Sequence, residues 1–71
     1  MNILVTGGNG YKGTVLVPLL LSEGHFVRSI DINWFGNYLQ PQKNLEIINC
    51  DIRDITFEHL KDIDVVIHLA N

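Results

Sequence analysis

Residues 3–13 decide the fold of this chain, and they read Ile-Leu-Val-Thr-Gly-Gly-Asn-Gly-Tyr-Lys-Gly. A short apolar run ends at Thr6 and is bounded by glycine, which is typical of a strand. Glycines follow at positions 7, 10 and 13, and an apolar helical run begins at once. A strand that turns directly into a helix leaves the first N–H groups of the helix without intrahelical partners, and their partial positive charge attracts phosphate. The stretch therefore predicts a phosphate-binding turn between a strand and a helix.

Each glycine of this turn has a mechanical role. Gly7 permits the tight turn, Gly10 lets a pyrophosphate approach the backbone, and Gly13 lets the helix lie close to the sheet. Two patterns overlap, because glycines 8, 10 and 13 fit G-x-G-x-x-G whereas glycines 7, 10 and 13 after Thr6 fit T-G-x-x-G-x-x-G. Asp31 lies 18 residues after Gly13, near the separation of about 20 at which an acidic side chain binds the ribose of a dinucleotide. Since a carboxylate there repels a 2′-phosphate, Asp31 predicts NAD rather than NADP.

The remaining apolar segments alternate between strand and helix patterns. We expect strands at 2–6, 26–32, 45–49 and 64–70, helices at 10–23 and 54–61, and a loop over 33–44. This order, β-α-β-loop-β-α-β, predicts an α/β fold, part of a doubly wound (Rossmann) parallel sheet with strand order 3-2-1-4. The first helix is apolar nearly all round and the last strand is apolar throughout, so both are expected to be buried on more than one side. In the second helix, Asp54 is the expected N-cap, with Phe57 and Leu60 facing inward.

The composition is that of a small globular domain. The 71 residues are 46% hydrophobic and 18% charged, which is typical of globular rather than disordered chains. The net charge of −3 lacks the basic surface that nucleic-acid binding requires, and the longest apolar run, 15–21, is too short to span a membrane. Cys50 is the one cysteine, so an internal disulfide is excluded and no Cys/His cluster has zinc spacing. We expect a cytoplasmic protein without a metal site and without a nucleic-acid or membrane partner.

Four motifs resemble those of the extended short-chain dehydrogenase/reductase superfamily and, within it, the NAD-dependent epimerase/dehydratase family. They are residues 6–13 (Thr-Gly-Gly-Asn-Gly-Tyr-Lys-Gly), 31–33 (Asp-Ile-Asn), 50–54 (Cys-Asp-Ile-Arg-Asp) and 66–71 (Val-Ile-His-Leu-Ala-Asn). Members of this family act mostly on nucleotide sugars. The resemblance therefore implies NAD as the cofactor, a nucleotide sugar as the substrate of the full-length protein, and a homodimeric assembly.

The resemblance also implies which residues contact the cofactor. The pyrophosphate is assigned to Gly7, Gly10, Tyr11 and Lys12, the adenosine ribose to Asp31 and Asn33, the adenine to Asp51 and Ile52, and the inner ribose and nicotinamide to Leu69, Ala70 and Asn71. Lys12 departs from the Ile or Leu that is usual in the family, and its charge suits a phosphate. His68 lies in the apolar final strand, and we interpret it as a packed core histidine rather than a catalytic one.

The catalytic pattern of the family, Tyr-x-x-x-Lys with a Ser or Thr, has no counterpart in these 71 residues. Val15 stands four residues after Tyr11, and Gln42 stands four residues after Tyr38. We therefore interpret residues 1–71 as the N-terminal part of an NAD-binding Rossmann domain that is not catalytic alone, its catalytic and substrate-binding parts being absent. Two alternatives remain: a non-catalytic dinucleotide-binding module or redox sensor, and a scaffold that associates through an exposed strand edge.

Overall fold

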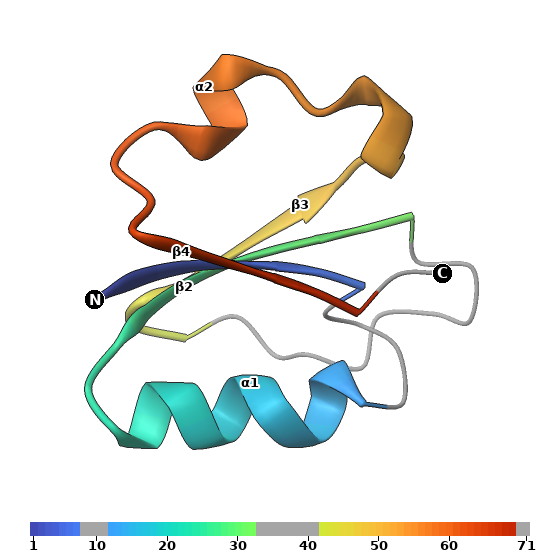
Figure 1. Ribbon diagram of the computed structural model, residues 1–71. Helices are drawn as coiled ribbons and strands as arrows, with labels where there is room; N and C mark the ends of the chain where they lie inside the picture. Colours follow the sequence, from blue (N-terminus) through green and yellow to red (C-terminus); the bar gives the residue numbers. More distant parts are fainter. Residues whose placement is uncertain (8–11, 33–41, 70–71) are drawn as a thin grey trace.

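The computed structural model describes residues 1–7, 12–32 and 42–69, and its centre is one parallel sheet (Figure 1). The strands are β1 (Asn2–Thr6), β2 (Phe26–Asp31), β3 (Leu45–Asn49) and β4 (Val65–His68). Their spatial order is β3-β2-β1-β4, and each pairing between these strands is parallel. The predicted α/β fold with strand order 3-2-1-4 is therefore confirmed, and the turn that follows β1 lies at the carboxyl edge of the sheet.

One face of the sheet is covered by α1 (Gly13–Ser22), which lies below the sheet in Figure 1. Val17 of this helix is fully buried together with Ile3, Val5 and Val27 of the sheet. Six partly buried apolar side chains pack around them: Leu20, Leu21, Leu45, Ile47, Ile67 and Leu69. Full burial of one such side chain stabilises a fold by about 1.5–3 kcal/mol, so this layer is the main core of the described chain.

The extent and surroundings of α1 differ from the prediction. The helix begins at Gly13, whereas the predicted start at Gly10 lies outside the described residues. Val15 and Leu19 are 69% and 56% exposed, so the expectation that the helix is buried on more than one side is wrong for the described part of the chain. The reason is that a single sheet contacts only one stripe of a helix.

The C-terminal end of α1 follows the glycine rule for helix ends. Glu23 is the C-cap, and Gly24 after it has a φ of 89°. The N–H groups of Gly24 and His25 donate to the carbonyls of Leu21 and Leu20 at 3.0 and 3.2 Å. Glycine adopts this left-handed conformation without the strain that a Cβ causes, so Gly24 stops the helix and directs the chain into β2.

The opposite face of the sheet lies beneath η1 (Ile52–Asp54) and α2 (Phe57–Leu60), on the far side from α1 in Figure 1. Leu4 and Ile30, which point to this face, are each 1% exposed. The sheet is thus enclosed between two layers, as doubly wound α/β folds require.

The second helix is shorter than predicted. A helix over 54–61 capped by Asp54 was expected from the sequence, but Thr56 is the N-cap of α2, and its side chain and that of His59 form a reciprocal capping box. Asp54 instead ends η1, and the backbone of Ile55 and Thr56 is extended between the two elements. The prediction of Asp54 as the cap is therefore wrong, because the η1 turn uses the residues before position 55.

Two apolar stretches that were predicted to be buried are exposed. Phe57 and Leu60 are 91% and 39% exposed, so their predicted inward orientation is wrong. Val65 and Val66 of β4 are 37% and 52% exposed, and β4 covers 65–68 rather than 64–70. Within the described residues β4 is an edge strand paired with β1 alone, so its outer side lacks the cover expected for a central parallel strand.

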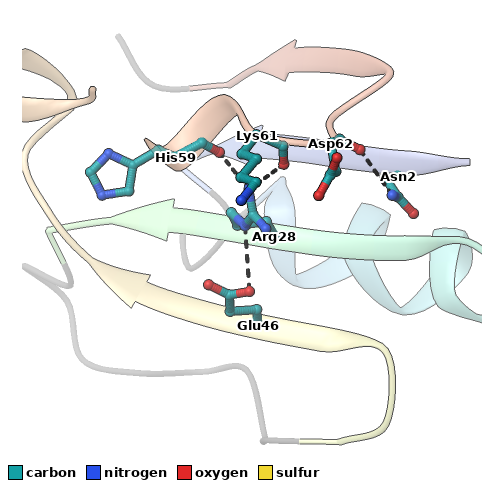
Figure 2. A network of polar contacts seen from close by, with 6 residues as sticks. All are labelled: Asn2, Arg28, Glu46, His59, Lys61 and Asp62. Carbon is teal, nitrogen blue, oxygen red and sulfur yellow. Dashed lines mark hydrogen bonds and ion pairs between the residues drawn. The ribbon is translucent and has the colours of Figure 1, made fainter. Parts of the chain in front are cut away.

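The Arg28 side chain connects α2 to the sheet through hydrogen bonds (Figure 2). Its Nη1 donates to the carbonyl oxygens of His59 and Lys61 at 2.7 and 3.1 Å. Its Nε donates to Oε2 of Glu46, its register partner on β3, at 3.4 Å. Carbonyls at the end of a helix carry partial negative charge that a guanidinium neutralises well, so Arg28 joins β2, β3 and the end of α2.

Candidate functional site

The turn after β1 begins at Gly7, whose backbone lies in the left-handed region with a φ of 77°. The Gly7 N–H donates to the carbonyl of Ile30 at 2.7 Å, so the pairing of β1 with β2 extends one residue beyond the strand. Side chains with a Cβ are strained at this φ. The tight turn predicted at Gly7 is present, while Gly10 and Tyr11 lie outside the described residues.

The N-terminus of α1 offers positive charge at the same edge of the sheet. Lys12 is the N-cap, its backbone is helical, and its side chain makes no capping hydrogen bond. The first turn of α1, which the structure describes in full, contains no acidic residue. Gly13 is buried, as a close contact between helix and sheet predicts. A helix end of this kind, with an exposed lysine beside it, favours a phosphate anion.

Asp31 ends β2, the neighbour of β1, and is half-buried. Its carbonyl accepts a hydrogen bond from the Cys50 N–H at 3.0 Å, which ties the ends of β2 and β3 together. Residues three apart in a strand lie on opposite faces, and Arg28 is engaged with Glu46 on the face under α2. Asp31 therefore lies at the carboxyl end of β2 on the face opposite Arg28. Its contact with a ribose stays a prediction, and Asn33 lies outside the described residues.

Asp51 opens η1 and binds Arg53 tightly. Its Oδ1 accepts from the Arg53 Nε at 3.1 Å and from the Arg53 N–H at 2.9 Å, and its Oδ2 accepts from Nη2 at 2.8 Å. These hydrogen bonds stabilise the charged carboxylate and lower the pKa of Asp51 from the ordinary 3.8 to about 2. The bonds from the Arg53 guanidinium make the largest contribution, and the bond from the Arg53 backbone N–H comes next. The neighbouring Ile52 is 41% exposed. The pair predicted to flank adenine is thus an ionised carboxylate beside an accessible apolar side chain.

Replacing Arg53 by glutamine is expected to return the pKa of Asp51 from about 2 towards 3.8. Because the folded-state pKa is lowered, the stability that this pair contributes is complete above pH 3.8 and is lost as the pH falls through about 2. The carboxyl chemical shift of Asp51, followed by NMR over this range, measures the effect. Arg53→Lys keeps the positive charge but lacks the planar guanidinium that binds both carboxylate oxygens, so it should retain only part of the lowering of the Asp51 pKa. A native Asp51 that titrates at 3.8 would contradict the Arg53 contact.

Leu69 follows β4 at the same edge of the sheet. Its N–H donates to the carbonyl of Thr6 at 2.9 Å, and its half-buried side chain packs against the core below the sheet. Ala70 and Asn71 lie outside the described residues. His68, interpreted from the sequence as a packed core residue, has an exposed side chain, and its Nδ1 lies 2.6 Å from Oγ1 of Thr6. That interpretation is therefore wrong, because β4 is an edge strand among the described residues.

The carboxyl edge of the sheet brings the described candidates to consecutive strand ends. Gly7 follows β1, Asp31 ends β2, Asp51 follows β3, and Leu69 follows β4. Two partners of the edge were missed from the sequence: Arg53, which holds Asp51, and Thr6, which holds His68. The spacing Asp-x-Arg is a usable signal for the first, since the side chain of a turn residue can bind the group two residues on. The Thr6 contact joins residues 62 apart, so no local signal marks it.

Two features are absent from the residues that the structure describes. In that part of the chain, no three His, Cys, Asp or Glu side chains gather as metal ligands. None of the helices described is long and apolar enough to cross a membrane. Cys50 is a free, half-buried thiol, and its Sγ–H donates to the carbonyl of Asp51 at 3.2 Å.

A parallel sheet ordered 3-2-1-4, with a glycine turn and a helix N-terminus at the carboxyl edge of β1, defines a dinucleotide-binding domain of the Rossmann class. Comparison with known protein families shows which family of Rossmann-class proteins this chain belongs to. The model of the NAD dependent epimerase/dehydratase family matches residues 3–71, and the chain belongs to that family. The cofactor of the family is NAD, which agrees with the prediction from Asp31.

Curated and solved relatives support this assignment. The chain is 38% identical to a UDP-glucose 4-epimerase of Corynebacterium glutamicum over 99% of its own length and 22% of the relative. It is 39% identical to a 3 beta-hydroxysteroid dehydrogenase/Delta 5→4-isomerase of Mycobacterium tuberculosis over 96% of its length and 18% of the relative. The crystal structure of WbmG from Bordetella bronchiseptica in complex with NAD superposes with a TM-score of 0.87, at 30% identity, covering 99% of this chain and 24% of WbmG. The chain thus spans less than a quarter of the length of these relatives.

Proposed function

We propose that residues 1–71 form the NAD-binding, N-terminal segment of a Rossmann domain in a nucleotide-sugar epimerase or dehydratase. The observation that carries this proposal is the meeting of Gly7, the N-terminus of α1 and Asp31 at one carboxyl edge, in a chain of this family. The similarity to a UDP-glucose 4-epimerase and to NAD-bound WbmG supports it.

The described residues fit a bound dinucleotide. The backbone at Gly7 and the N-terminus of α1, with Lys12 beside it, would hold the pyrophosphate. The Asp31 carboxylate would accept hydrogen bonds from ribose hydroxyls and repel a 2′-phosphate, while Asp51 and Ile52 would flank the adenine. NAD, when bound, supplies a hydride acceptor, and the residues of this chain bind and orient it. The remaining contacts in the proposal are Gly10, Tyr11, Asn33, Leu69, Ala70 and Asn71.

Catalysis is assigned to residues other than these 71. Neither Tyr11 nor Tyr38 has a lysine four residues later, so neither completes the Tyr-x-x-x-Lys pattern. The segment is therefore expected to bind cofactor without turning over a sugar. A homodimer, implied by the family resemblance, and a cytoplasmic location, expected from the composition, belong to this proposal as well.

Similarity to a 3 beta-hydroxysteroid dehydrogenase supports a second class of substrate, the 3-hydroxysteroids. The 3 beta-hydroxysteroid dehydrogenase relative is as similar to this chain as the epimerase is, at 39% against 38% identity. In this proposal the residues of this segment contact the cofactor rather than a substrate, so both substrate classes would share this half of the site. Assays of the protein that contains these residues, with UDP-glucose and with a 3-hydroxysteroid as substrates, distinguish them.

Replacing Asp31 by asparagine is the direct test of the cofactor site. The neutral amide loses the charged acceptor for the ribose hydroxyls, and NAD affinity is expected to fall about 10- to 100-fold. The preference for NAD over NADP should shrink as well, because the repulsion of the 2′-phosphate is removed. Calorimetric titration of both dinucleotides into the protein that contains these residues measures the two effects.

Glu23→Gln is the matched control, since it removes one exposed carboxylate at the far end of α1. Its NAD affinity should equal that of the unaltered protein. If Asp31→Asn binds NAD as tightly as this control does, the assignment of Asp31 to the ribose is wrong.

A further inference from the structure

The side chain of Asn49 connects the end of β3 to the end of β2, and the proposed function does not use it. Asn49 is the last residue of β3 and the register partner of Asp31, the last residue of β2. Its amide nitrogen lies 3.1 Å from the carbonyl oxygen of Asp31 and 3.3 Å from that of Ile32. Both partners are acceptors, so the amide presents its NH2 group, whose two N–H bonds match the two carbonyls.

These two carbonyls mark the point at which the chain leaves the sheet. Successive carbonyls of a strand point to opposite sides, so one amide group reaches both only where the strand has ended. The Asp31 carbonyl also accepts the Cys50 N–H at 3.0 Å. The end of β3 therefore fixes the backbone of Asp31 and Ile32, and with it the direction in which the Asp31 side chain leaves the sheet.

The Asn49 contact contributes more to geometry than to stability. The Asn49 side chain is exposed and Ile32 is 37% exposed. Water competes for both carbonyls and for the amide at such a place, so the net gain in stability from these hydrogen bonds is small. Two directional bonds from one planar group nevertheless restrict how the backbone of residues 31 and 32 is oriented.

We propose that Asn49 is a positioning residue of the cofactor site, which orients the Asp31 carboxylate towards the ribose by holding the carbonyls of Asp31 and Ile32. The repulsion of a 2′-phosphate depends on its distance from that carboxylate. Asn49 therefore contributes to the preference for NAD over NADP while it acts through Asp31. This inference rests on the proposed NAD site and adds to it a residue that determines specificity.

The test removes the amide donor and measures both dinucleotides. Asn49→Leu keeps the approximate size of the side chain, and Asn49→Ala removes most of it. Calorimetric titration of NAD and of NADP is carried out on the folded protein that contains these residues. Both variants should bind NAD about three- to tenfold more weakly, and the ratio of NAD affinity to NADP affinity should fall by about threefold or more. A purely structural role would weaken both dinucleotides alike and leave this ratio unchanged.

Glu46→Gln is the matched control on the same strand. It weakens the contact of Glu46 with Arg28, which joins β3 to β2 away from the carboxyl edge. Its NAD affinity and its ratio of NAD to NADP affinity should both stay within about twofold of the unaltered protein. The proposal is overturned if Asn49→Leu and Asn49→Ala keep the affinity ratio of this control.

A double variant tests whether Asn49 acts through Asp31. Asp31→Asn combined with Asn49→Leu should bind NAD within about twofold of Asp31→Asn alone, because the carboxylate that Asn49 orients is already absent. Losses that multiply in the double variant overturn the proposal. If Asp31→Asn binds NAD as tightly as Glu23→Gln does, the proposed function itself is wrong at this residue. A loss for Asp31→Asn without any loss for Asn49→Leu refutes the positioning alone.

Discussion

Replacing Gly7 by valine is expected to weaken NAD binding about tenfold or more in the protein that contains these residues. The φ of Gly7 is 77°, a conformation that costs a residue with a Cβ about 1–2 kcal/mol and is least tolerated by β-branched side chains. Relief of this strain rotates the turn and displaces the N–H that donates to Ile30. Since the proposed pyrophosphate contacts begin at this turn, affinity falls along with stability. Calorimetric titration of NAD, combined with thermal unfolding, measures both.

Gly24→Val is the matched control for this substitution. Gly24 also has a positive φ, of 89°, and an added Cβ there meets nothing within 4 Å. It lies at the other end of α1, away from the carboxyl edge. This variant should lose stability to a similar degree while its NAD affinity stays unchanged. Equal NAD affinities for the Gly7 and Gly24 variants would show that the turn after β1 has no part in binding.

Truncating Leu4 to alanine is expected to cost about 3 kcal/mol of the free energy of unfolding. Leu4 is 1% exposed and lies between the sheet and the layer of η1 and α2. In a chain of this size such a loss lowers the unfolding midpoint by roughly 10–25 °C. It is also a large part of the total stability of a small domain, which is about 5–15 kcal/mol. Thermal and urea unfolding monitored by circular dichroism measure the change.

Phe57→Ala is the control, because it removes a larger side chain that is 91% exposed. Its effect on the free energy of unfolding should stay within about 0.5 kcal/mol. A loss as large as that of Leu4→Ala would mean that Phe57 packs inward, as its sequence spacing predicts. The two variants together therefore decide between the sequence pattern and the observed orientation.

The features that local sequence determines were predicted well. The bounds of β1 and β3 match the prediction, and β2 is one residue shorter. The glycines that follow β1 and α1 act where backbone geometry requires them, as the φ values of Gly7 and Gly24 confirm. These elements depend on β-branched runs and on glycine turns, whose effects extend over only a few residues, so the chain encodes them locally.

Several of the errors lie in the segment between β3 and β4. The expected single helix is divided into η1 and α2, because Asp51 caps a short turn with Arg53 and Thr56 starts a new cap with His59. Asp51 and Thr56 are both suitable N-caps and lie within six residues of each other. Sequence spacing alone does not show which of them starts the longer helix. The same segment is held at its far end by Arg28, from a strand about thirty residues earlier.

The sequence by itself determined the order of the elements, the parallel sheet and the glycine turn at Gly7, and through Asp31 it predicted NAD as the cofactor. The tertiary structure alone decided which apolar side chains are covered and which distant polar groups meet. Arg28 reaches the carbonyls of α2, and Thr6 reaches His68, only because parallel strands far apart in the chain become neighbours. The physical reason is the range of the forces involved: backbone preference acts within a few residues, whereas burial and side-chain pairing depend on contacts that exist only after the sheet has formed.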